Sequence, residues 1–493
     1  MDQPRAATDG VAEPADRQAI ESPAARASEP PRAAAPIEAL TQALEDLARL
    51  PASPAPAALG APRSLDIPER GRPLAEAAAE LVREILPRAA RSDHPRFFAF
   101  IPSPAGAASR LGEALTAAVN PQAGAWRQAE GPAAVEAAMI RWMADAAGFP
   151  VTAGGLFMGG GSAANLTAVA AARDAKLQPE KRAEGVAYLS AETHSSVLRA
   201  LAVAGFLPGQ IRRVALDAAF RMDASDLARL VAADLAAGRR PFLVVATAGA
   251  TNTGAVDPLD EIAALCERSD LWLHVDGAFG ASALLSPAHR PLLTGIERAD
   301  SLAWDAHKWL FQTYGCGALI VRDRARLEQA FSLGADYLRD GDLPGSAPNF
   351  WDLGLETSRP ARALKLWLTL QTMGTTAIGE AVAHGFRLAA WAESELRRTP
   401  SWRIVTAASM AIVTFRFEPS RLSPEQTDAL NLEAARRVES DGFALVGGTR
   451  VEGRVALRIC ALHPDATERD MRETIRRLDA EARAALEETP SRG

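Results

Sequence analysis

The sequence predicts an α/β fold built on a mostly parallel sheet. Between residues 96 and 370, short apolar runs typical of buried strands alternate with longer helical patterns. The strand-like runs include VAYLS, PFLVVAT, LWLHVD, SLAW and GALIVRD, and the helical ones include SSVLRALAVAG and PLDEIAALCERS. Because such alternation places helices on the faces of a parallel sheet, it indicates one large α/β layer structure.

The C-terminal part of the chain has a different pattern. SMAIVTFRFEP and FALVGGTRVEGRVALRIC predict two or three strands, and ATERDMRETIRRLDAEARAAL predicts a helix. We therefore expect a large domain over residues 96–372 and a smaller α+β domain over 373–493. Residues 36–95 carry two helical patterns, and residues 1–35 are rich in Ala, Pro, Glu and Arg without an apolar period, which predicts a disordered tail.

Composition excludes several classes of function. A net charge of −7 without any basic run argues against nucleic-acid binding. The three cysteines, Cys266, Cys316 and Cys460, are too far apart in sequence to suggest a disulfide framework or a CxxC zinc site, and no metal is expected. MDQPRAATDG lacks the apolar segment of a secretory signal, and no uncharged run is long enough to span a bilayer. A cytoplasmic protein without a membrane partner is expected.

Lysine usage singles out one residue. The 493 residues contain four lysines and 50 arginines, so positive charge alone is supplied by arginine. Lys176, Lys181 and Lys365 lie in polar or helical stretches where a solvated face explains them. Lys308 lies in the apolar decapeptide SLAWDAHKWL, where an amine that loses its proton can act as a nucleophile, as a guanidinium cannot. The alternative is a chance lysine that reaches solvent from a strand end.

A glycine-rich turn precedes one predicted helix. GGLFMGGGSAANL places three glycines, Gly159 to Gly161, directly before Ser162, which is a good helix N-cap residue. Free backbone N–H groups at such a helix start suit a phosphate. Since neither GxxxxGK[ST] nor GxGxxG is present, a small phosphate is favoured over a nucleotide, and a simple flexible turn is the alternative.

Three further residues follow predicted strands, at the sheet edge where ligands bind in open parallel sheets. Asp276 ends the apolar run LWLHVD and needs a cationic or hydrogen-bonding partner, which a protonated heteroaromatic nitrogen or an ordinary ion pair would supply. His194, in AETHSSV, suits stacking on a flat ring or accepting a proton, although a loop histidine is the default interpretation. Thr251 lies in a Gly/Thr/Asn turn after FLVVAT.

Together, a phosphate cradle, an acid for a ring nitrogen, an imidazole for a ring face and a nucleophilic lysine are what pyridoxal 5′-phosphate requires. The motifs GGGSAAN, ETHSSV, HVDGAFG and WDAHKW occur in the order and spacing of the group II pyridoxal-phosphate decarboxylases, and the chain resembles that family from about residue 65 to 480. The family includes aromatic-amino-acid, glutamate and cysteine-sulfinate decarboxylases. The resemblance is densest over residues 241–323.

The resemblance implies a type I, aspartate aminotransferase-like fold that forms a homodimer, with residues 36–95 packed on the partner. It implies that Lys308 holds the cofactor covalently, that Asp276 pairs with the pyridinium nitrogen and that His194 stacks on the ring. Thr251 would lie near the phenolic oxygen. The residues implied around the phosphate and as a further cofactor contact are Gly160, Gly161, Ser162, His307 and Ala278.

The resemblance also implies the reaction. The substrate amine displaces Lys308, the pocket holds the bond to the carboxylate perpendicular to the ring, and carbon dioxide leaves. Tyr337, one of three tyrosines, lies at the family's distance from the lysine for the group that returns a proton to Cα, and the Gly/Pro/Asp-rich residues after it suit a lid. A packed aromatic residue is the alternative.

The substrate side of the pocket is implied by further matches. Phe100, Ile101 and Pro102 occupy the family's pocket positions, and acid-specific members typically carry a polar amide at the position of Phe100. Trp126 matches another aromatic position. Arg359 matches an arginine near the active site. These matches favour decarboxylation of an aromatic or bulky apolar L-amino acid. An aldehyde synthase, a lyase on the same fold and an acidic amino-acid decarboxylase remain alternatives. Packing in a dimer core would also explain the aromatic residues, and an ordinary position at the start of a helix would explain Arg359.

Two departures from the family pattern are evident. Asp305 and Ala306 stand where many members have Asn-Pro, and a carboxylate near a phosphate repels it unless it is turned away or paired. EGPAAVE replaces the SPACTE of aromatic enzymes. Outside this cofactor class, a phosphate-holding carbohydrate or nucleotide enzyme and a catalytically silent paralogue remain the competing hypotheses.

Overall fold

A computed structural model describes residues 34–49, 53–56, 65–101, 104–332 and 348–488. The described chain divides into two compact units. One contains residues 34–49 and 65–88, and the other contains 53–56 and the chain from residue 89 onward. Most of the predicted N-terminal tail, Tyr337 and Pro102 lie outside the described residues.

The N-terminal unit is helical. It consists of α1 (Ala34–Ala48) and α2 (Leu74–Glu80), which continues as a π-turn over Leu81–Ile85 and a 3-10 turn over Leu86–Arg88. The Arg83 guanidinium donates to the Asp46 carboxylate at 3.2 Å and so ties the turn to α1.

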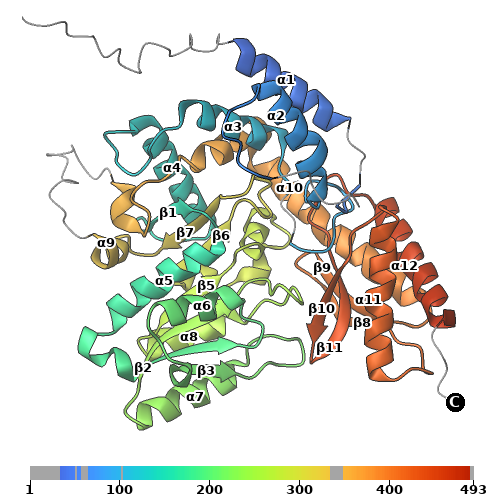
Figure 1. The fold of residues 1–493 in the computed structure, drawn as a ribbon. Coiled ribbons are helices and arrows are strands. Elements are labelled where there is room, and N and C mark those ends of the chain that lie inside the picture. The colour runs from blue at the N-terminus through green and yellow to red at the C-terminus, as the bar shows by residue number, and fades with distance from the viewer. Residues whose placement is uncertain (1–33, 50–52, 57–64, 102–103, 333–347, 489–493) are drawn as a thin grey trace, which may run out of the picture. The chain divides into compact units, whose positions relative to one another are not determined.

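The second unit is built on a seven-stranded sheet with the order β1-β7-β6-β5-β4-β2-β3 (Figure 1). The strands are β1 (Gly154–Met158), β2 (Gly185–Ser190), β3 (Ile211–Val214), β4 (Arg240–Thr247), β5 (Trp272–Asp276), β6 (Ser301–Asp305) and β7 (Gly317–Val321). Neighbours from β3 to β6 pair in parallel, and β7 runs antiparallel to both β6 and β1. The predicted mostly parallel sheet is confirmed.

Helices cover both faces of this sheet. One hydrophobic cluster joins one face to α4 (Glu130–Ala146), α7 (Ala224–Ala236), α8 (Leu259–Arg268) and the start of α10 (Ala363–Arg398). A second cluster joins the other face to α5 (Gly161–Lys176), α6 (Ser195–Val203) and α9 (Ala325–Phe331). The large domain is therefore a three-layer α/β/α structure.

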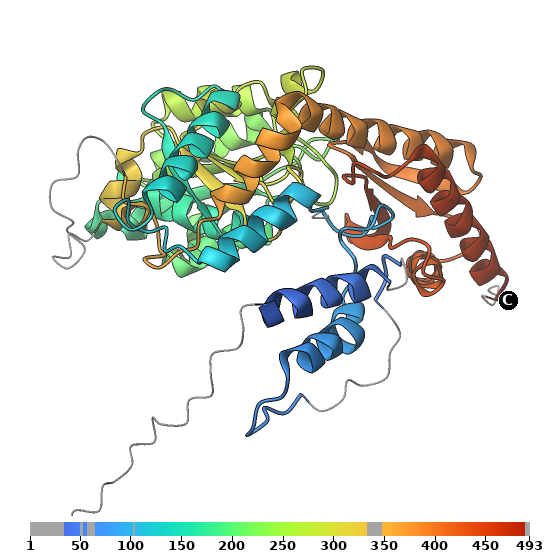
Figure 2. The ribbon, with the colours of Figure 1, turned by 90° about the horizontal axis from the view of Figure 1, so that it is seen from above.

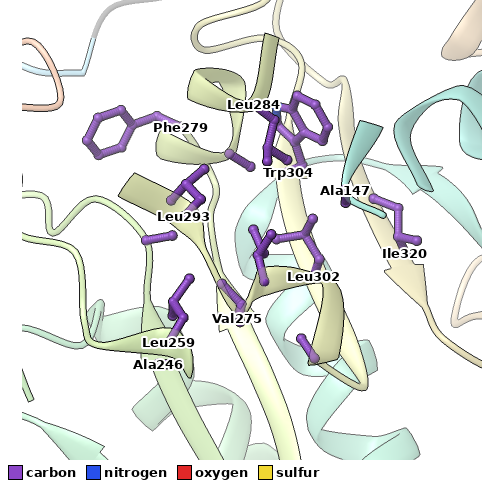
Figure 3. Close-up of a cluster of buried hydrophobic side chains, with 14 of the residues drawn as sticks. Ala147, Ala246, Leu259, Val275, Phe279, Leu284, Leu293, Leu302, Trp304 and Ile320 are labelled. Carbon is purple, nitrogen blue, oxygen red and sulfur yellow. The ribbon is translucent and has the colours of Figure 1, made fainter. Parts of the chain in front are cut away.

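Alternation along the central strands decides which side chains face α5. On β5 and β6, Val275, Leu302 and Trp304 point into the first cluster, where they pack with Leu259 and Leu293 (Figure 3). Because strand side chains alternate between faces, the intervening positions face α5 instead. These positions are His274, Asp276, Ser301, Ala303 and Asp305. The α5 side of the sheet thus collects the polar strand residues.

The C-terminal part forms its own antiparallel sheet with the order β10-β11-β9-β8. Its strands are β8 (Trp402–Ser409), β9 (Ile412–Phe417), β10 (Gly447–Val451) and β11 (Arg454–Cys460), and α11 (Pro424–Ser440) and α12 (Glu468–Glu488) pack on it. The long helix α10 runs from the large sheet to this small one (Figure 2). It is interrupted at Gly374, whose φ of +73° is accessible to glycine, next to the boundary predicted at residue 372.

Candidate active site

A cavity of about 470 Å³ lies at the carboxyl ends of β2, β4, β5 and β6. Each of these strands is followed by residues that line it, as expected for ligand sites of open parallel sheets. All nine residues that the sequence predicts as cofactor contacts line this cavity. They are Gly160, Gly161, Ser162, His194, Thr251, Asp276, Ala278, His307 and Lys308.

The glycine turn between β1 and α5 forms one wall of the cavity. Gly160 has a φ of +151°, and a Cβ atom there would lie 3.0 Å from the His307 ring. A Cβ atom on Gly161 would lie 3.0 Å from Asp305 Oδ2, and one on Gly317 would lie 2.5 Å from Gly160 Cα. The turn and the β6–β7 connection therefore pack too closely for side chains, which leaves a backbone surface toward the cavity.

The start of α5 differs from the prediction in one detail. Ser162 was expected as the N-cap, but Gly160 occupies the cap position and Ser162 lies inside the first turn. The carbonyl of Gly160 accepts the first helical bonds, from Ala163 at 2.9 Å and Ala164 at 3.1 Å. Because the first N–H groups of a helix have no partner within it, those of the Gly161 turn remain suited to an anion.

The four lysines behave differently, and all are described. Lys176 pairs with Asp270 and Lys181 with Glu184 at the surface. Lys365 was predicted on a solvated face, and this was wrong, because its buried ammonium contacts Glu113 and donates to the carbonyl of Tyr314. Only Lys308 lines the cavity.

Lys308 follows β6 in a tight turn, in which its N–H donates to the Asp305 carbonyl at 3.1 Å. Its side chain is 26% exposed, and its Nζ lies 3.2 Å from Asp305 Oδ2. The Asp305 carboxylate is 1% exposed, and its other oxygen, Oδ1, has no hydrogen-bond partner among the described residues. The sequence left the role of Asp305 open, and the structure shows it paired with the lysine.

His307 is oriented by the β7 side of the same turn. The Cys316 N–H donates to His307 Nδ1 at 3.3 Å, so the neutral ring carries its proton on Nε2, 3.6 Å from Asp305 Oδ2. Burial lowers the pKa of His307, although Asp305 opposes this shift. His307 therefore presents a neutral N–H donor beside the glycine turn.

Asp276 and His194 are held on the opposite side of the cavity from different elements. At the end of β5, the Asp276 carboxylate accepts from Asn165 Nδ2 at 3.0 Å and from the Ala278 N–H at 3.2 Å. His194 caps α6, where its Nδ1 accepts from the Ser196 N–H at 3.3 Å. Both side chains are thus held by hydrogen bonds within the protein.

Several lining residues were not predicted. Asn165, Glu192, Ser196, Thr247 and Tyr314 also face the cavity. Helical spacing provided a signal for one of them, because Asn165 lies four residues after Gly161 and so follows it on the same face of α5. Glu192 lies two residues before His194, and burial raises the pKa of its carboxyl group.

The predicted substrate-side residues that the structure describes do not line the cavity of the single chain. Phe100 is 64% exposed, Ile101 packs at the edge of the first cluster, and Trp126 packs against the second cluster. Pro102 and Tyr337 lie outside the described residues. Among the described residues, the cavity is therefore lined by the predicted cofactor contacts together with residues such as Tyr314, which is 63% exposed.

Arg359 does not lie in the pocket where it was predicted. It forms a fully buried ion pair with Glu136, in which its Nη2 lies 2.6 Å from Oε1 and its Nη1 lies 3.0 Å from Oε2. It also donates to the carbonyls of Ala123 and Phe157, and Phe350 lies under the guanidinium. These contacts commit both terminal nitrogens of Arg359 to the protein interior, away from the cavity.

Similarity to known proteins agrees with this geometry. The family described as "Pyridoxal-dependent decarboxylase conserved domain" matches residues 56–418. The chain belongs to this family. It is a pyridoxal-phosphate enzyme, and members of the family are carboxy-lyases.

Relatives of this decarboxylase cover most of its length. The aromatic-L-amino-acid decarboxylase of Bacillus atrophaeus is 39% identical over 84% of the chain and 86% of the relative. The L-2,4-diaminobutyrate decarboxylase of Rhizobium meliloti (strain 1021) is 33% identical over 81% of the chain and 80% of the relative. The crystal structure of Oryza sativa TDC with PLP and tryptamine superposes with a TM-score of 0.87, at 27% identity, over 93% of this chain and 99% of that one.

Proposed function

We propose that this decarboxylase converts an aromatic or bulky apolar L-amino acid into its amine and carbon dioxide at the Lys308 cavity. The observation that carries the proposal is the convergence of the four predicted cofactor contacts, namely the glycine turn, Asp276, His194 and Lys308, on one cavity of about 470 Å³. A cavity of this size suits a cofactor together with a small substrate.

The residues present fit pyridoxal phosphate. Lys308 supplies the amine for the covalent bond, and the backbone of the Gly160–Ser162 turn with His307 Nε2–H supplies donors for the phosphate. Asp276, already held by Asn165, supplies the anion for the ring nitrogen. When bound, the cofactor supplies an electron sink for the bond that breaks.

The protein's own contribution is orientation and exclusion of water. His194 would cover one face of the bound ring, and Thr251, which follows β4, and Lys308 line the same cavity. Holding the carboxylate bond perpendicular to the ring selects that bond for cleavage. We assign the return of a proton to Cα to Tyr337, whose predicted lid segment lies outside the described residues.

The substrate class follows from apolar residues and from relatives. Phe100, Ile101 and Trp126 carry no charge that would bind an acidic side chain. The B. atrophaeus relative acts on aromatic L-amino acids by name, and a relative of Oryza sativa subsp. japonica that is 30% identical is a tryptophan decarboxylase. An Arabidopsis thaliana relative that is 29% identical is a phenylacetaldehyde synthase, which makes the product a necessary part of any test.

We further propose that the site is completed by a second copy of the chain. On α3 (Ala107–Val119), Leu111, Leu115 and Val119 follow one another at helical spacing and are 56%, 57% and 78% exposed. An apolar stripe of this kind marks an interaction surface. A second copy on this surface would explain why Phe100 and Trp126 lie outside the cavity of their own chain.

A cytoplasmic location is proposed on the state of the cysteines. Cys266, Cys316 and Cys460 are all free and buried, which suits a reducing compartment. Among the described helices, none is long and apolar enough to cross a membrane. In the same part of the chain, no group of three or more His, Cys, Asp or Glu side chains is arranged to hold a metal ion.

The test is a panel of L-amino acids read by product mass. Holoenzyme is incubated with aromatic, aliphatic and acidic amino acids and with 2,4-diaminobutyrate, and amine, carbon dioxide, aldehyde and hydrogen peroxide are quantified. Amine and carbon dioxide in equal amounts from an aromatic substrate are expected. Aldehyde with hydrogen peroxide and no amine would refute decarboxylation as the net reaction, and a preference for an acidic substrate or 2,4-diaminobutyrate would refute the substrate class.

A further inference from the structure

A continuous chain of hydrogen bonds joins His194 to Asp276 beneath the cavity. It runs through Ser196 and Asn165 and continues behind them to His274 and Ser301. Asn165, His274 and Ser301 are each at most 1% exposed. Because water does not reach these three side chains, each polar atom must find its partner within the protein.

The direction of the buried half is set by Asn165, because its amide nitrogen faces Asp276 Oδ2, which can only accept, and its Oδ1 therefore faces His274. His274 carries its proton on Nε2 and donates it to Asn165 Oδ1 at 2.9 Å. The unprotonated Nδ1 of His274 accepts from the Ser301 hydroxyl at 2.8 Å, and the Ser301 oxygen in turn accepts from Trp272 Nε1–H, also at 2.8 Å. Burial lowers the pKa of His274 to about 4, so the ring has only this one proton to give.

The amide of Asn165 then divides its two protons between the two halves of the site. One goes to Asp276 Oδ2 at 3.0 Å, since a carboxylate can only accept. The other goes to Ser196 Oγ at 2.9 Å. The Ser196 hydroxyl, having accepted from Asn165, gives its own proton to His194 Nδ1 at 2.7 Å.

His194 Nδ1 thus receives two donors, the Ser196 hydroxyl and the Ser196 N–H at 3.3 Å. A nitrogen that accepts two hydrogen bonds carries no proton, so the proton of the imidazole lies on Nε2, the opposite edge of the ring. The tautomer of His194 is therefore set at Ser196, whose oxygen in turn accepts from the Asn165 amide.

This arrangement matters for a cationic ring. Asp276 favours a protonated nitrogen in the cofactor ring, and a charged imidazolium stacked on that ring would repel it. A neutral His194 with its proton on Nε2 avoids this repulsion. The Asn165 amide thus orients the Asp276 carboxylate and, through Ser196, also supports the neutral form of His194. This form does not repel a ring that Asp276 keeps protonated.

We infer that Asn165 is a positioning residue that couples the two ring contacts: one amide proton holds the Asp276 carboxylate, and the other, through Ser196, keeps His194 in the Nε2–H tautomer. The functional meaning of this coupling rests on the proposed function, because it assumes that Asp276 and His194 hold the cofactor ring. The tautomer itself does not depend on the cofactor.

The experiment uses the full chain without cofactor, labelled with ¹⁵N-histidine, and reads the two ring nitrogens by long-range ¹H–¹⁵N NMR. His194→Gln assigns the signal among the seven histidines. In the wild type we expect a bare Nδ1 and a protonated Nε2. Asn165→Asp is nearly isosteric, still accepts from His274 and has no amide proton for Ser196, so the Ser196 hydroxyl turns toward the new carboxylate.

With the hydroxyl turned away, His194 Nδ1 keeps only the Ser196 N–H donor at 3.3 Å, so a mixture of the two tautomers is expected in place of the single Nε2–H form. Ser196→Ala is expected to give a mixture of both forms. Ser195→Ala, at the exposed neighbouring serine, is the matched control and leaves the wild-type pattern. A wild-type His194 protonated on Nδ1, or an unchanged tautomer in both test variants, overturns the inference.

A second measurement separates positioning of Asp276 from general damage. The Asn165→Ala variant, in which no second carboxyl group faces Asp276, is titrated with pyridoxal phosphate and with an analogue that has a carbon in place of the ring nitrogen. Because a hydrogen bond to a charged group is lost, the dissociation constant for pyridoxal phosphate is expected to rise roughly tenfold or more, with little change for the analogue. An equal change for both ligands overturns the Asp276 half. A wild type that binds neither ligand refutes the proposed function and leaves the NMR result intact.

Discussion

Replacing Arg359 tests whether it is part of the fold or part of the substrate pocket. Arg359→Met keeps the length of the side chain and leaves the Glu136 carboxylate buried without its counter-ion. The two side chains are 0% and 1% exposed, and Arg359 also serves the carbonyls of Ala123 and Phe157. Removing one partner of such a pair costs about 3–5 kcal/mol, so we expect the free energy of unfolding to fall by that amount.

The assay is equilibrium unfolding in urea of cofactor-free protein, beside steady-state kinetics of the holoenzyme. Arg362→Met is the matched control, since its bond to Glu356 is partly exposed and should cost about 1 kcal/mol or less. Adding Glu136→Gln to Arg359→Met should restore part of the loss, because no unpaired charge is then buried.

The result that would refute this reasoning is a specific kinetic one. If Arg359→Met unfolds like the wild type but raises KM tenfold or more, the guanidinium contacts substrate rather than Glu136 in the working enzyme. A loss of stability with unchanged KM in the protein that remains folded confirms the buried pair.

Four further predictions follow from the site and its surroundings. Lys308→Ala should abolish the absorption band of the covalently bound cofactor and lower amine production at least ~10³-fold; retained turnover contradicts the role of Lys308. Asp305→Asn removes a buried carboxylate beside the glycine turn and should tighten cofactor binding about three- to tenfold in a fluorescence titration, whereas weaker binding would show that the acid is needed. Because the pKa of buried His274 is about 4 in the native state against an ordinary 6.5, stability should fall by about 3 kcal/mol as pH drops through that window, since the unfolded chain takes up the proton first. Buried Asp257, whose pKa is raised to about 6, makes stability change with pH in the opposite direction, so the quantity to measure is the difference in unfolding free energy between wild type and His274→Gln at each pH. Parallel pH curves of unfolding free energy for the two proteins contradict the prediction. Leu115→Glu should yield a monomer in analytical ultracentrifugation with loss of activity, and an active dimer would contradict the α3 interface.

Local sequence was sufficient to predict five of the seven strands of the large sheet and to select residues that line one cavity. Period and turn residues located β2, β4, β5, β6 and β7, and residues that follow parallel strands must meet at one edge of the sheet. This is why the residues after four separate strands line one cavity. The scarcity of lysine isolated Lys308 because a nucleophilic amine has no substitute among the other basic side chains.

Pairings between distant residues could not be obtained in this way. Arg359 and Glu136 are 223 positions apart, and no periodic pattern relates them. Lys365 belongs to an amphipathic helix by sequence, yet packing of α10 against α3 buries its ammonium beside Glu113. The same limit hid the path from Trp272 to His194, whose members come from β5, β6, α5 and α6.

By itself, the sequence identified the residue types from which the proposed site is built: a lysine in an apolar decapeptide, a carboxylate that ends a buried strand and a glycine-rich helix start. Those properties depend on residue type and on local conformation. Only the tertiary structure decided the partners, because hydrogen bonds and ion pairs in the interior depend on which faces of separate elements meet. In the tertiary structure, Asp305 pairs with Lys308 and Arg359 is buried beside Glu136. The amide of Asn165 lies between Asp276 and Ser196 and donates to both.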